Sequence, residues 1–285
     1  MTNKFKLAWG GALLAVAGLA HADPFYLDAG VNYDPTGLGK VCSTCTSMKD
    51  QFTITYGSRT VVSDTDSSGG LSVGDTTNTV GGYGYTGGID VNSITSLKPK
   101  QVFNTNSDNG FNSAYYLTFS FANLAGVVTS ITPSGLPVVV YSGGLIQMYL
   151  YNGSSTINFM NIKITTGFID GVGTTLNGEA DFTGISDLTY ANLFHSGTYS
   201  CNGSSGFYDI WKNCNTTGDL KINFASHFDS DLNHTTVTPN PDGSTTITSQ
   251  HNGQASFAIP EPASLALVGL SLVGLAGIRR RKNAA

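Results

Sequence analysis

The acidic segment 64–75 carries residue types in a spacing that suits a metal ion. Read as a 12-residue calcium loop, it places Asp64, Asp66 and Ser68 at positions 1, 3 and 5. A glycine follows at the turn position, and Asp75 closes the loop at position 12. Calcium takes six to eight oxygen ligands, which side chains two residues apart in a curled loop can supply. The alternative is a solvated Asp/Ser/Gly turn, because no helical pattern flanks the loop. The sequence therefore predicts calcium as the candidate cofactor, bound by Asp64, Asp66, Ser68 and Asp75.

The four cysteines form two close pairs along the chain, Cys42 with Cys45 and Cys201 with Cys214. An even number of cysteines in an exported chain predicts disulfides, and sequence alone leaves three pairings. Local pairing is favoured, because each pair lies in its own polar loop. Two alternatives stay open. A redox Cys-x-x-Cys site requires a helix N-terminus that lowers the first thiol's pKa, and a four-cysteine zinc site requires a tighter second pair.

Enzymatic motifs are weak in this chain. No His-x-x-x-His metal spacing is present. His227 near Asp229 and Asp231, or Glu179 near Asp181, could form a polar site, but alternating carboxylates on a strand or turn are common without function. The prediction is a protein that is not an enzyme.

Aromatic side chains in glycine-rich loops offer another kind of site. Their apolar faces could stack on sugar rings, and the alternative is that they pack the loops against the core. The residues concerned are Tyr83, Tyr85, Tyr199, Tyr208 and Trp211.

The elements that must position these residues are strands. Apolar residues alternate with polar ones at Phe52–Tyr56, Leu117–Phe121 and Met160–Ile164, the pattern of strands with one buried face. Glycine is abundant at 35 residues, and turns rich in Gly, Asn and Asp separate the strands. We therefore expect an all-β fold, an antiparallel β-sandwich or jelly roll.

The two ends of the chain have patterns of their own. Residues 1–22 carry two lysines, the apolar run Leu7–Leu19 and the cleavage pattern Ala20-His21-Ala22, which predicts a secretory signal peptide. The exported chain then begins at Asp23. The predicted organisation is a signal peptide (1–22), a β-rich exported domain (23–232), a Thr/Ser-rich terminal hairpin and spacer (233–259), and a C-terminal segment (260–285).

The C-terminal segment joins a proline-flanked triplet, an apolar run at 263–278 and a basic tail. The triplet and the tail arginines are Pro260, Glu261, Pro262, Arg279, Arg280 and Arg281. A 16-residue apolar helix is roughly 24 Å long, short of the ~30 Å hydrocarbon core, and could span by recruiting its flanks. The cationic tail should stay cytoplasmic. The alternative to a processed segment is a simple membrane anchor.

This segment resembles the PEP-CTERM sorting signal of Gram-negative bacteria. The resemblance implies export across the inner membrane, transient membrane anchoring, cleavage by an exosortase, and release or transfer to the cell surface. The layout is also similar to flocculation-associated PEP-CTERM proteins, in the Asp-Pro-Thr-Gly at 34–37 and the strand that ends just before Pro260. That similarity implies a non-enzymatic role in exopolysaccharide-linked biofilm or floc formation.

Two other functions remain open. One is a carbohydrate-binding module, with or without calcium, and the other is a secreted glycan hydrolase. Nucleic acid is not an expected partner, because the exported part has eight basic residues against 19 acidic ones.

Overall fold

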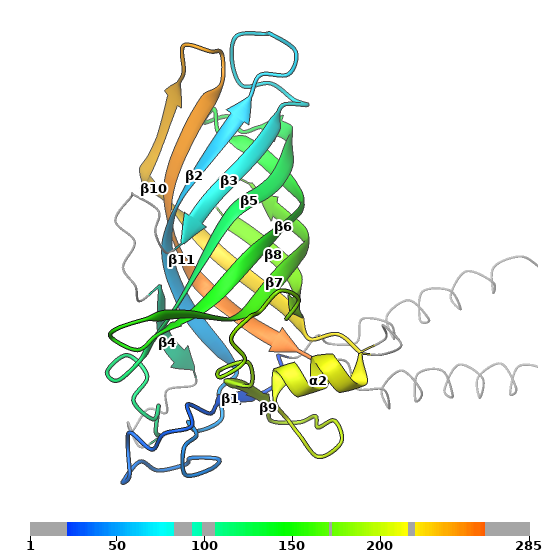
Figure 1. Ribbon diagram of the computed structural model, residues 1–285. Coiled ribbons are helices and arrows are strands. Elements are labelled where there is room, and N and C mark those ends of the chain that lie inside the picture. Colours follow the sequence, from blue (N-terminus) through cyan, green and yellow to red (C-terminus); the bar gives the residue numbers. More distant parts are fainter. Residues whose placement is uncertain (1–21, 83–92, 99–105, 171–172, 216–219, 260–285) are drawn as a thin grey trace, which may run out of the picture.

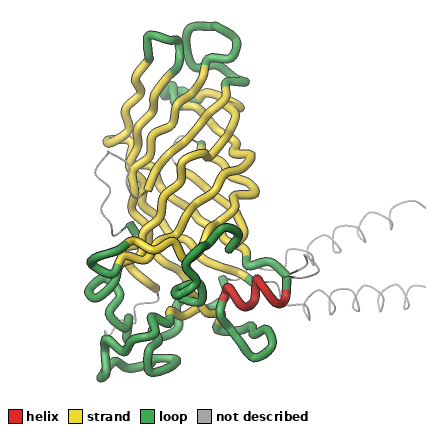
Figure 2. The backbone as a smooth tube through the Cα atoms, in the orientation of Figure 1, coloured by secondary structure: helices red, strands yellow, loops and turns green. Residues whose placement is uncertain are grey.

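The computed structural model describes residues 22–82, 93–98, 106–170, 173–215 and 220–259 (Figures 1 and 2). The expected signal peptide is outside these residues except for Ala22, and the C-terminal hydrophobic helix and basic tail lie outside them entirely. The elements are β1 (Phe25–Leu27), β2 (Gln51–Ser63), β3 (Thr76–Gly82), β4 (Ile94–Lys98), β5 (Tyr116–Ile131), β6 (Pro137–Tyr151), β7 (Thr156–Ile169), β8 (Gly173–Asp181), β9 (Phe194–Ser196), α2 (Phe207–Cys214), β10 (Asn223–Pro239) and β11 (Thr245–Ala258).

The long strands form one antiparallel sheet that closes on itself. Its strands follow the order β2, β3, β5, β6, β7, β8, β10 and β11, and β11 pairs back onto β2. That closing ladder runs from Thr245 opposite Val62 to Ala255 opposite Phe52. The expected all-β architecture is confirmed. The expected sandwich is not what forms, because the pairing of β11 with β2 turns the sheet into an eight-stranded barrel (Figure 2).

Two shorter strands share one position in this barrel. β3 pairs with the upper part of β2, from Ser58 to Ser63, whereas β4 pairs with the lower part, from Gln51 to Ile54. Since β3 and β4 follow one another along the same edge of β2, they serve together as one long strand of the barrel.

One end of the barrel is plugged. β1 and β9 form a small antiparallel sheet there, and α2 lies beside it (Figure 1). Phe25 of β1 and Phe194 of β9 pack with ring centroids 5.4 Å apart, and Phe207 of α2 lies 5.1 Å from Phe257 of β11. All four rings are buried. Burial of these large apolar faces is the main source of stability at this end.

The interior changes character along each strand. In β2 every second side chain points inward: Phe52, Ile54 and Tyr56 come first, and Ser58 and Thr60 follow at the same spacing. The plugged half of the barrel is therefore aromatic, and the half nearer the β2–β3 loop is hydroxyl-rich.

Two segments differ from expectation. Residues 233–259 do contain a hairpin, but β11 is a full barrel strand, so residues 245–258 are part of the domain rather than a spacer. The helix α2 was not predicted, although Phe207, Ile210, Trp211 and Cys214 have helical spacing on one side of it. Within the described residues, no helix is long and apolar enough to cross a membrane.

Candidate functional site

The acidic segment forms the connection between β2 and β3, at the end of the barrel opposite the plug (Figure 1). Asp64 directly follows β2 and Asp75 directly precedes β3. The β10–β11 turn lies beside the loop, since a Cβ placed on Gly243 would be 3.6 Å from Asp64 Oδ2.

The loop brings the three predicted carboxylates together. One carboxylate oxygen from each of Asp64, Asp66 and Asp75 lies within 4.8 Å of the other two. Gly69, which the calcium interpretation places at the turn position, has a φ of +81°, which favours glycine. Ser68 contacts the cluster through its backbone N–H, which donates to Asp64 Oδ1 at 3.1 Å and to Asp66 Oδ1 at 3.0 Å.

The carboxylates are also held by the loop's own donors. Asp75 is fully buried; its Oδ1 accepts a bond from the Thr65 N–H at 2.9 Å, and its Oδ2 from the Ser72 N–H at 2.8 Å. Asp64 Oδ2 accepts from the Gly69 N–H at 2.9 Å. The loop is therefore a turn in which backbone N–H groups of the loop donate hydrogen bonds to its own aspartate carboxylates.

The pKa values of Asp75 and Asp66 reflect hydrogen bonds within the loop. Burial raises the pKa of Asp75, but the bonds from Thr65 and Ser72 outweigh it, so the pKa lies below its usual value. The pKa of Asp66 is lowered chiefly by hydrogen bonds from Ser68. Three converging carboxylates fit a hard cation such as calcium, which they would hold through their free lone pairs. Calcium binding stays a prediction.

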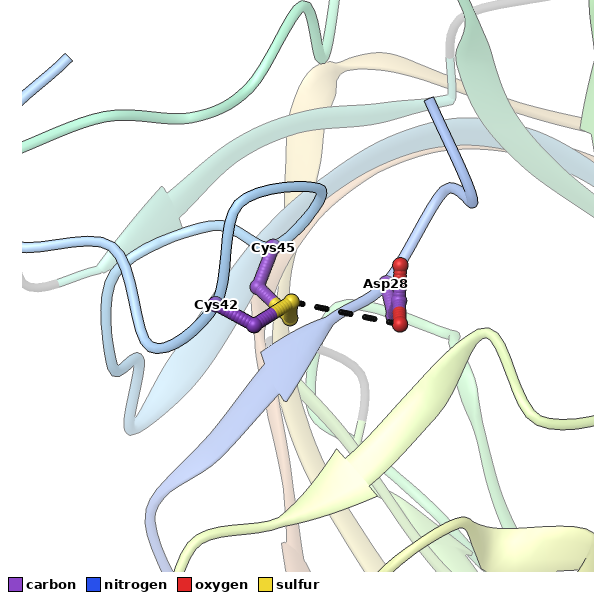
Figure 3. A group of neighbouring side chains, drawn as sticks. All are labelled: Asp28, Cys42 and Cys45. Atoms are coloured by element: carbon purple, nitrogen blue, oxygen red, sulfur yellow. Dashed lines mark hydrogen bonds between the residues drawn. A yellow bond between two sulfur atoms is a disulfide. The ribbon is translucent and has the colours of Figure 1, made fainter. Parts of the chain in front are cut away.

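Both disulfides form, with the local pairing favoured from the sequence. Cys42 is bonded to Cys45 and Cys201 to Cys214, and no cysteine is free. Cys42 lies in a turn in which Cys45 N–H donates to Cys42 C=O at 3.2 Å, and its Sγ is 4.0 Å from Asp28 Oδ2 (Figure 3). The redox alternative required a helix N-terminus here, and the structure has a turn.

The loop aromatics that the structure describes pack inward. Tyr199, Tyr208 and Trp211 are partly buried against the core. Trp211 lies 5.6 Å from Phe182 between ring centroids, and Tyr208 stacks on Trp211 at 6.2 Å. These rings therefore fasten α2 to the barrel. Tyr83 and Tyr85 lie outside the described residues.

The other acidic candidates form surface pairs. His227 Nε2 is 3.7 Å from Asp229 Oδ1, with both side chains more than two-thirds exposed. Glu179 pairs with Lys221 at 2.7 Å. Exposed ion pairs of this kind contribute little to stability.

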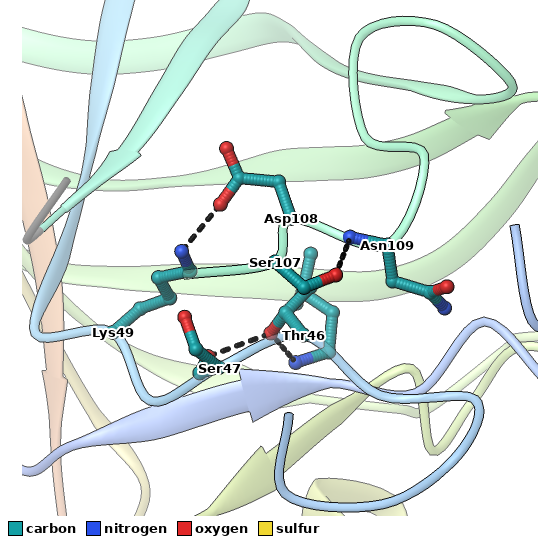
Figure 4. Close-up of polar contacts among 7 residues, drawn as sticks. Thr46, Ser47, Lys49, Ser107, Asp108 and Asn109 are labelled. Atoms are coloured by element: carbon teal, nitrogen blue, oxygen red, sulfur yellow. Dashed lines mark hydrogen bonds and ion pairs between the residues drawn. The ribbon is translucent and has the colours of Figure 1, made fainter. Parts of the chain in front are cut away.

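A buried polar cluster near the plug was missed in the sequence. The Lys49 side chain is fully buried, and its Nζ donates to Asp108 Oδ1 (Figure 4). Beside it, Ser107 Oγ accepts from the Asn109 N–H at 3.0 Å, and Thr46 Oγ1 donates to the Ser47 carbonyl at 2.9 Å. The cluster joins two loops that are distant in sequence, so no local pattern could have revealed it.

A second missed cluster surrounds His251, on the inner face of β11. Its ring stacks on Tyr56 with centroids 4.7 Å apart. Nε2 is 2.7 Å from Ser58 Oγ, and Nδ1 is 3.2 Å from Ser230 Oγ. Burial lowers the pKa of His251 to about 4, so the ring is neutral at physiological pH.

The barrel ends at Ala258, and the segment that follows carries the triplet, apolar run and basic tail. A family model for the PEP-CTERM protein-sorting motif matches residues 258–282. The chain carries a PEP-CTERM sorting motif. This motif marks a protein that is exported, anchored transiently in the membrane and processed by an exosortase, and hence a surface-displayed or secreted protein. No curated protein and no solved structure matches the chain.

Proposed function

We propose that this is an exosortase-processed surface or matrix protein with a non-enzymatic role in exopolysaccharide-linked biofilm or floc formation. In this proposal the source is a Gram-negative bacterium, and a signal peptide is removed after Ala22. The barrel is then the part that remains outside the cell, where it associates with the polysaccharide.

The main support for this proposal is that the barrel ends directly before the sorting motif. Ile259, the last described residue before the triplet, is buried, and its N–H donates to the Asp23 carboxylate. The Asp23 N–H in turn donates to the Phe257 carbonyl at 2.9 Å. The first residue of the expected mature chain therefore contacts the residue that precedes the triplet. Removal of both terminal segments would leave every described strand of the barrel intact.

The sorting step is tested by the intact mass of the surface or secreted form. The expected mass is that of a chain that begins at Asp23 and lacks the apolar run and basic tail. Glu261→Ala should keep the full C-terminus on the protein, whereas Glu179→Ala, at the other glutamate, should not. Recovery of the chain through Ala285 as the mature wild-type form would contradict exosortase processing.

The role in aggregation is tested in the producing bacterium. Deletion of the gene should reduce floc or biofilm mass, and the wild-type chain should restore it. The purified protein should cofractionate with the extracellular polysaccharide without shortening it. Unchanged aggregation in the deletion strain would contradict the proposed role, and release of oligosaccharides would contradict its non-enzymatic nature.

A second candidate is a calcium-dependent carbohydrate-binding module. The convergence of Asp64, Asp66 and Asp75 favours it. Polysaccharide binding that disappears in EDTA and returns with calcium would support this function over the first one.

A further inference from the structure

The hydroxyl-rich half of the barrel interior contains a cavity of ≈ 40 Å³. Its floor is buried and includes Ser58, Thr60 and His251, while its rim is half-buried and includes Ser230, Thr235 and Ser249. The remaining lining is apolar: Leu136, Pro137, Val139 and Ile169 lie at or near β6 and β7, and Ile247 is on β11 beside Ser249.

The rim lies where the barrel wall is incomplete. β8 pairs with β10 only as far as Gly173 opposite Asp229. Beyond that point, from Ser230 onward, β10 pairs with β11 alone among the described strands. A ligand can therefore approach from the side of β10 that faces away from β11, next to Ile169 at the end of β7.

The lining selects neutral molecules. Among the described residues, no Asp, Glu, Lys or Arg side chain lines the cavity. His251 is kept uncharged by burial. A charged group would lose its hydration here without gaining a partner of opposite charge, which is costly.

The hydrogen-bonding groups of the lining come from β2, β10 and β11. Each hydroxyl can donate one bond and accept two, so those of Ser58, Thr60 and Ser249 keep unused capacity beyond their internal bonds. On the same inner face, Thr174 is paired in register with Ile169, and its buried hydroxyl has no partner within the described structure. A fitting ligand has hydroxyls on one edge and C–H groups on the other, as a sugar ring does.

The volume limits how much of such a ligand enters. A cavity of this size holds one or two water-sized groups. A whole pyranose ring does not fit, but its exocyclic hydroxymethyl group does. The ring itself would then lie at the rim, between Leu136 and Thr235.

We propose that this cavity binds a neutral hexose residue of an extracellular polysaccharide, with the exocyclic hydroxymethyl group inserted among Ser58, Thr60 and His251. The inference rests on the proposed association with polysaccharide and assigns it a site. It places recognition inside the barrel rather than at the loop aromatics or the acidic loop.

Saturation-transfer NMR with three probes tests the site. Methyl glucopyranoside carries the hydroxymethyl group, methyl xylopyranoside lacks it, and methyl glucuronopyranoside has a carboxylate in its place. We expect the strongest signal at the C6 protons of the glucoside. Loss of the hydrogen bonds made by the hydroxymethyl group should weaken binding of the xyloside roughly tenfold, and the glucuronide should bind at least as poorly.

Methyl galactoside and methyl mannoside serve as further neutral hexosides. Absence of signal from the glucoside, the galactoside and the mannoside overturns the proposal, as does binding of the glucuronide equal to that of the glucoside.

Matched variants locate the binding. Ser249→Leu fills the rim and should abolish the signal, and the isosteric Thr235→Val should weaken it. Gln250→Leu changes the neighbouring residue, which is exposed on the outer face, and should leave the signal unchanged. Circular dichroism and melting temperature show that each variant is folded. Unchanged hexoside binding by both folded rim variants overturns the site.

Cofractionation with the polysaccharide separates a wrong site from a wrong function. If wild-type protein and Ser249→Leu cofractionate equally with the extracellular polysaccharide, the protein binds polysaccharide elsewhere, and the cavity assignment is wrong. If the wild-type protein does not cofractionate at all, the proposed function itself is contradicted.

Discussion

The neutral, buried His251 should make the stability of the barrel depend on pH. Its pKa is lowered from 6.5 to about 4 by burial between β2, β10 and β11. The unfolded chain takes up a proton on this residue below pH ~6.5, whereas the folded chain does so only near pH 4. Its contribution to stability is therefore complete above pH 6.5 and is lost as the pH falls from 6.5 toward 4.

The size of the effect follows from the shift in pKa. A shift of one pKa unit corresponds to about 1.4 kcal/mol, so His251 should account for roughly 3 kcal/mol between pH 7 and pH 4. Urea unfolding followed by circular dichroism at pH 7, 5.5 and 4.5 measures it. The variant His251→Gln, which keeps one donor and one acceptor but does not titrate, should lose much less stability over this range.

His195 supplies the control. Its pKa is also lowered, chiefly by burial, and it lies at the plugged end near Ser205, far along the chain from His251. His195→Gln should remove only its own share of the pH dependence. If wild type and His251→Gln lose equal stability between pH 7 and 4.5, His251 is not buried as a neutral ring, and the reasoning about the cavity's charge fails with it.

Three further predictions concern the loops. Asp75→Ala should destabilise the protein by about 2–4 kcal/mol in urea unfolding, because two backbone N–H groups lose a buried charged acceptor; an effect below 1 kcal/mol would contradict this. If the loop binds calcium, stability should rise by about 2.7 kcal/mol at a hundredfold excess over Kd, and Asp64→Ala with Asp66→Ala should abolish the gain. A melting temperature unaffected by millimolar calcium and by EDTA would reduce the loop to a turn. Replacement of Cys201 and Cys214 by Ser should cost roughly 3 kcal/mol and speed hydrogen exchange in α2 more than in the barrel strands; equal acceleration in both would contradict a local role.

The strands could be predicted from the sequence because alternation is a local signal. Phe52, Ile54 and Tyr56 show by themselves which face of β2 is buried. Closure could not be predicted in this way. It depends on β11 pairing with β2, almost two hundred residues earlier in the chain, and the same alternating pattern suits a sandwich equally well. The polar composition of 233–259 also obscured β11, because two of its inner residues, Ser249 and His251, are polar.

Only part of the candidate site could be predicted from the sequence. The spacing of Asp64, Asp66 and Asp75 correctly predicted that they converge. It could not predict that the Ser68 N–H would donate to two of these carboxylates, since that contact depends on the turn geometry. The spacing in the sequence indicates which residues come together, whereas the backbone conformation between them determines which of their atoms form contacts.

The alternation in β2 also indicates which side chains line the polar half of the barrel interior. It continues without a change of register from Tyr56 to Ser58 and Thr60, so the hydroxyls face the same interior as the aromatic rings. A core built only for stability would continue with apolar residues there, because buried hydroxyls must find partners that apolar side chains do not need. The plugged end already supplies a dense aromatic core around Phe194 and Phe257. In the polar half the hydroxyls find partners among themselves, Ser58 with His251 at 2.7 Å and Thr60 with Thr79 at 2.8 Å. The capacity that they keep beyond these bonds is what the proposed hexose would use.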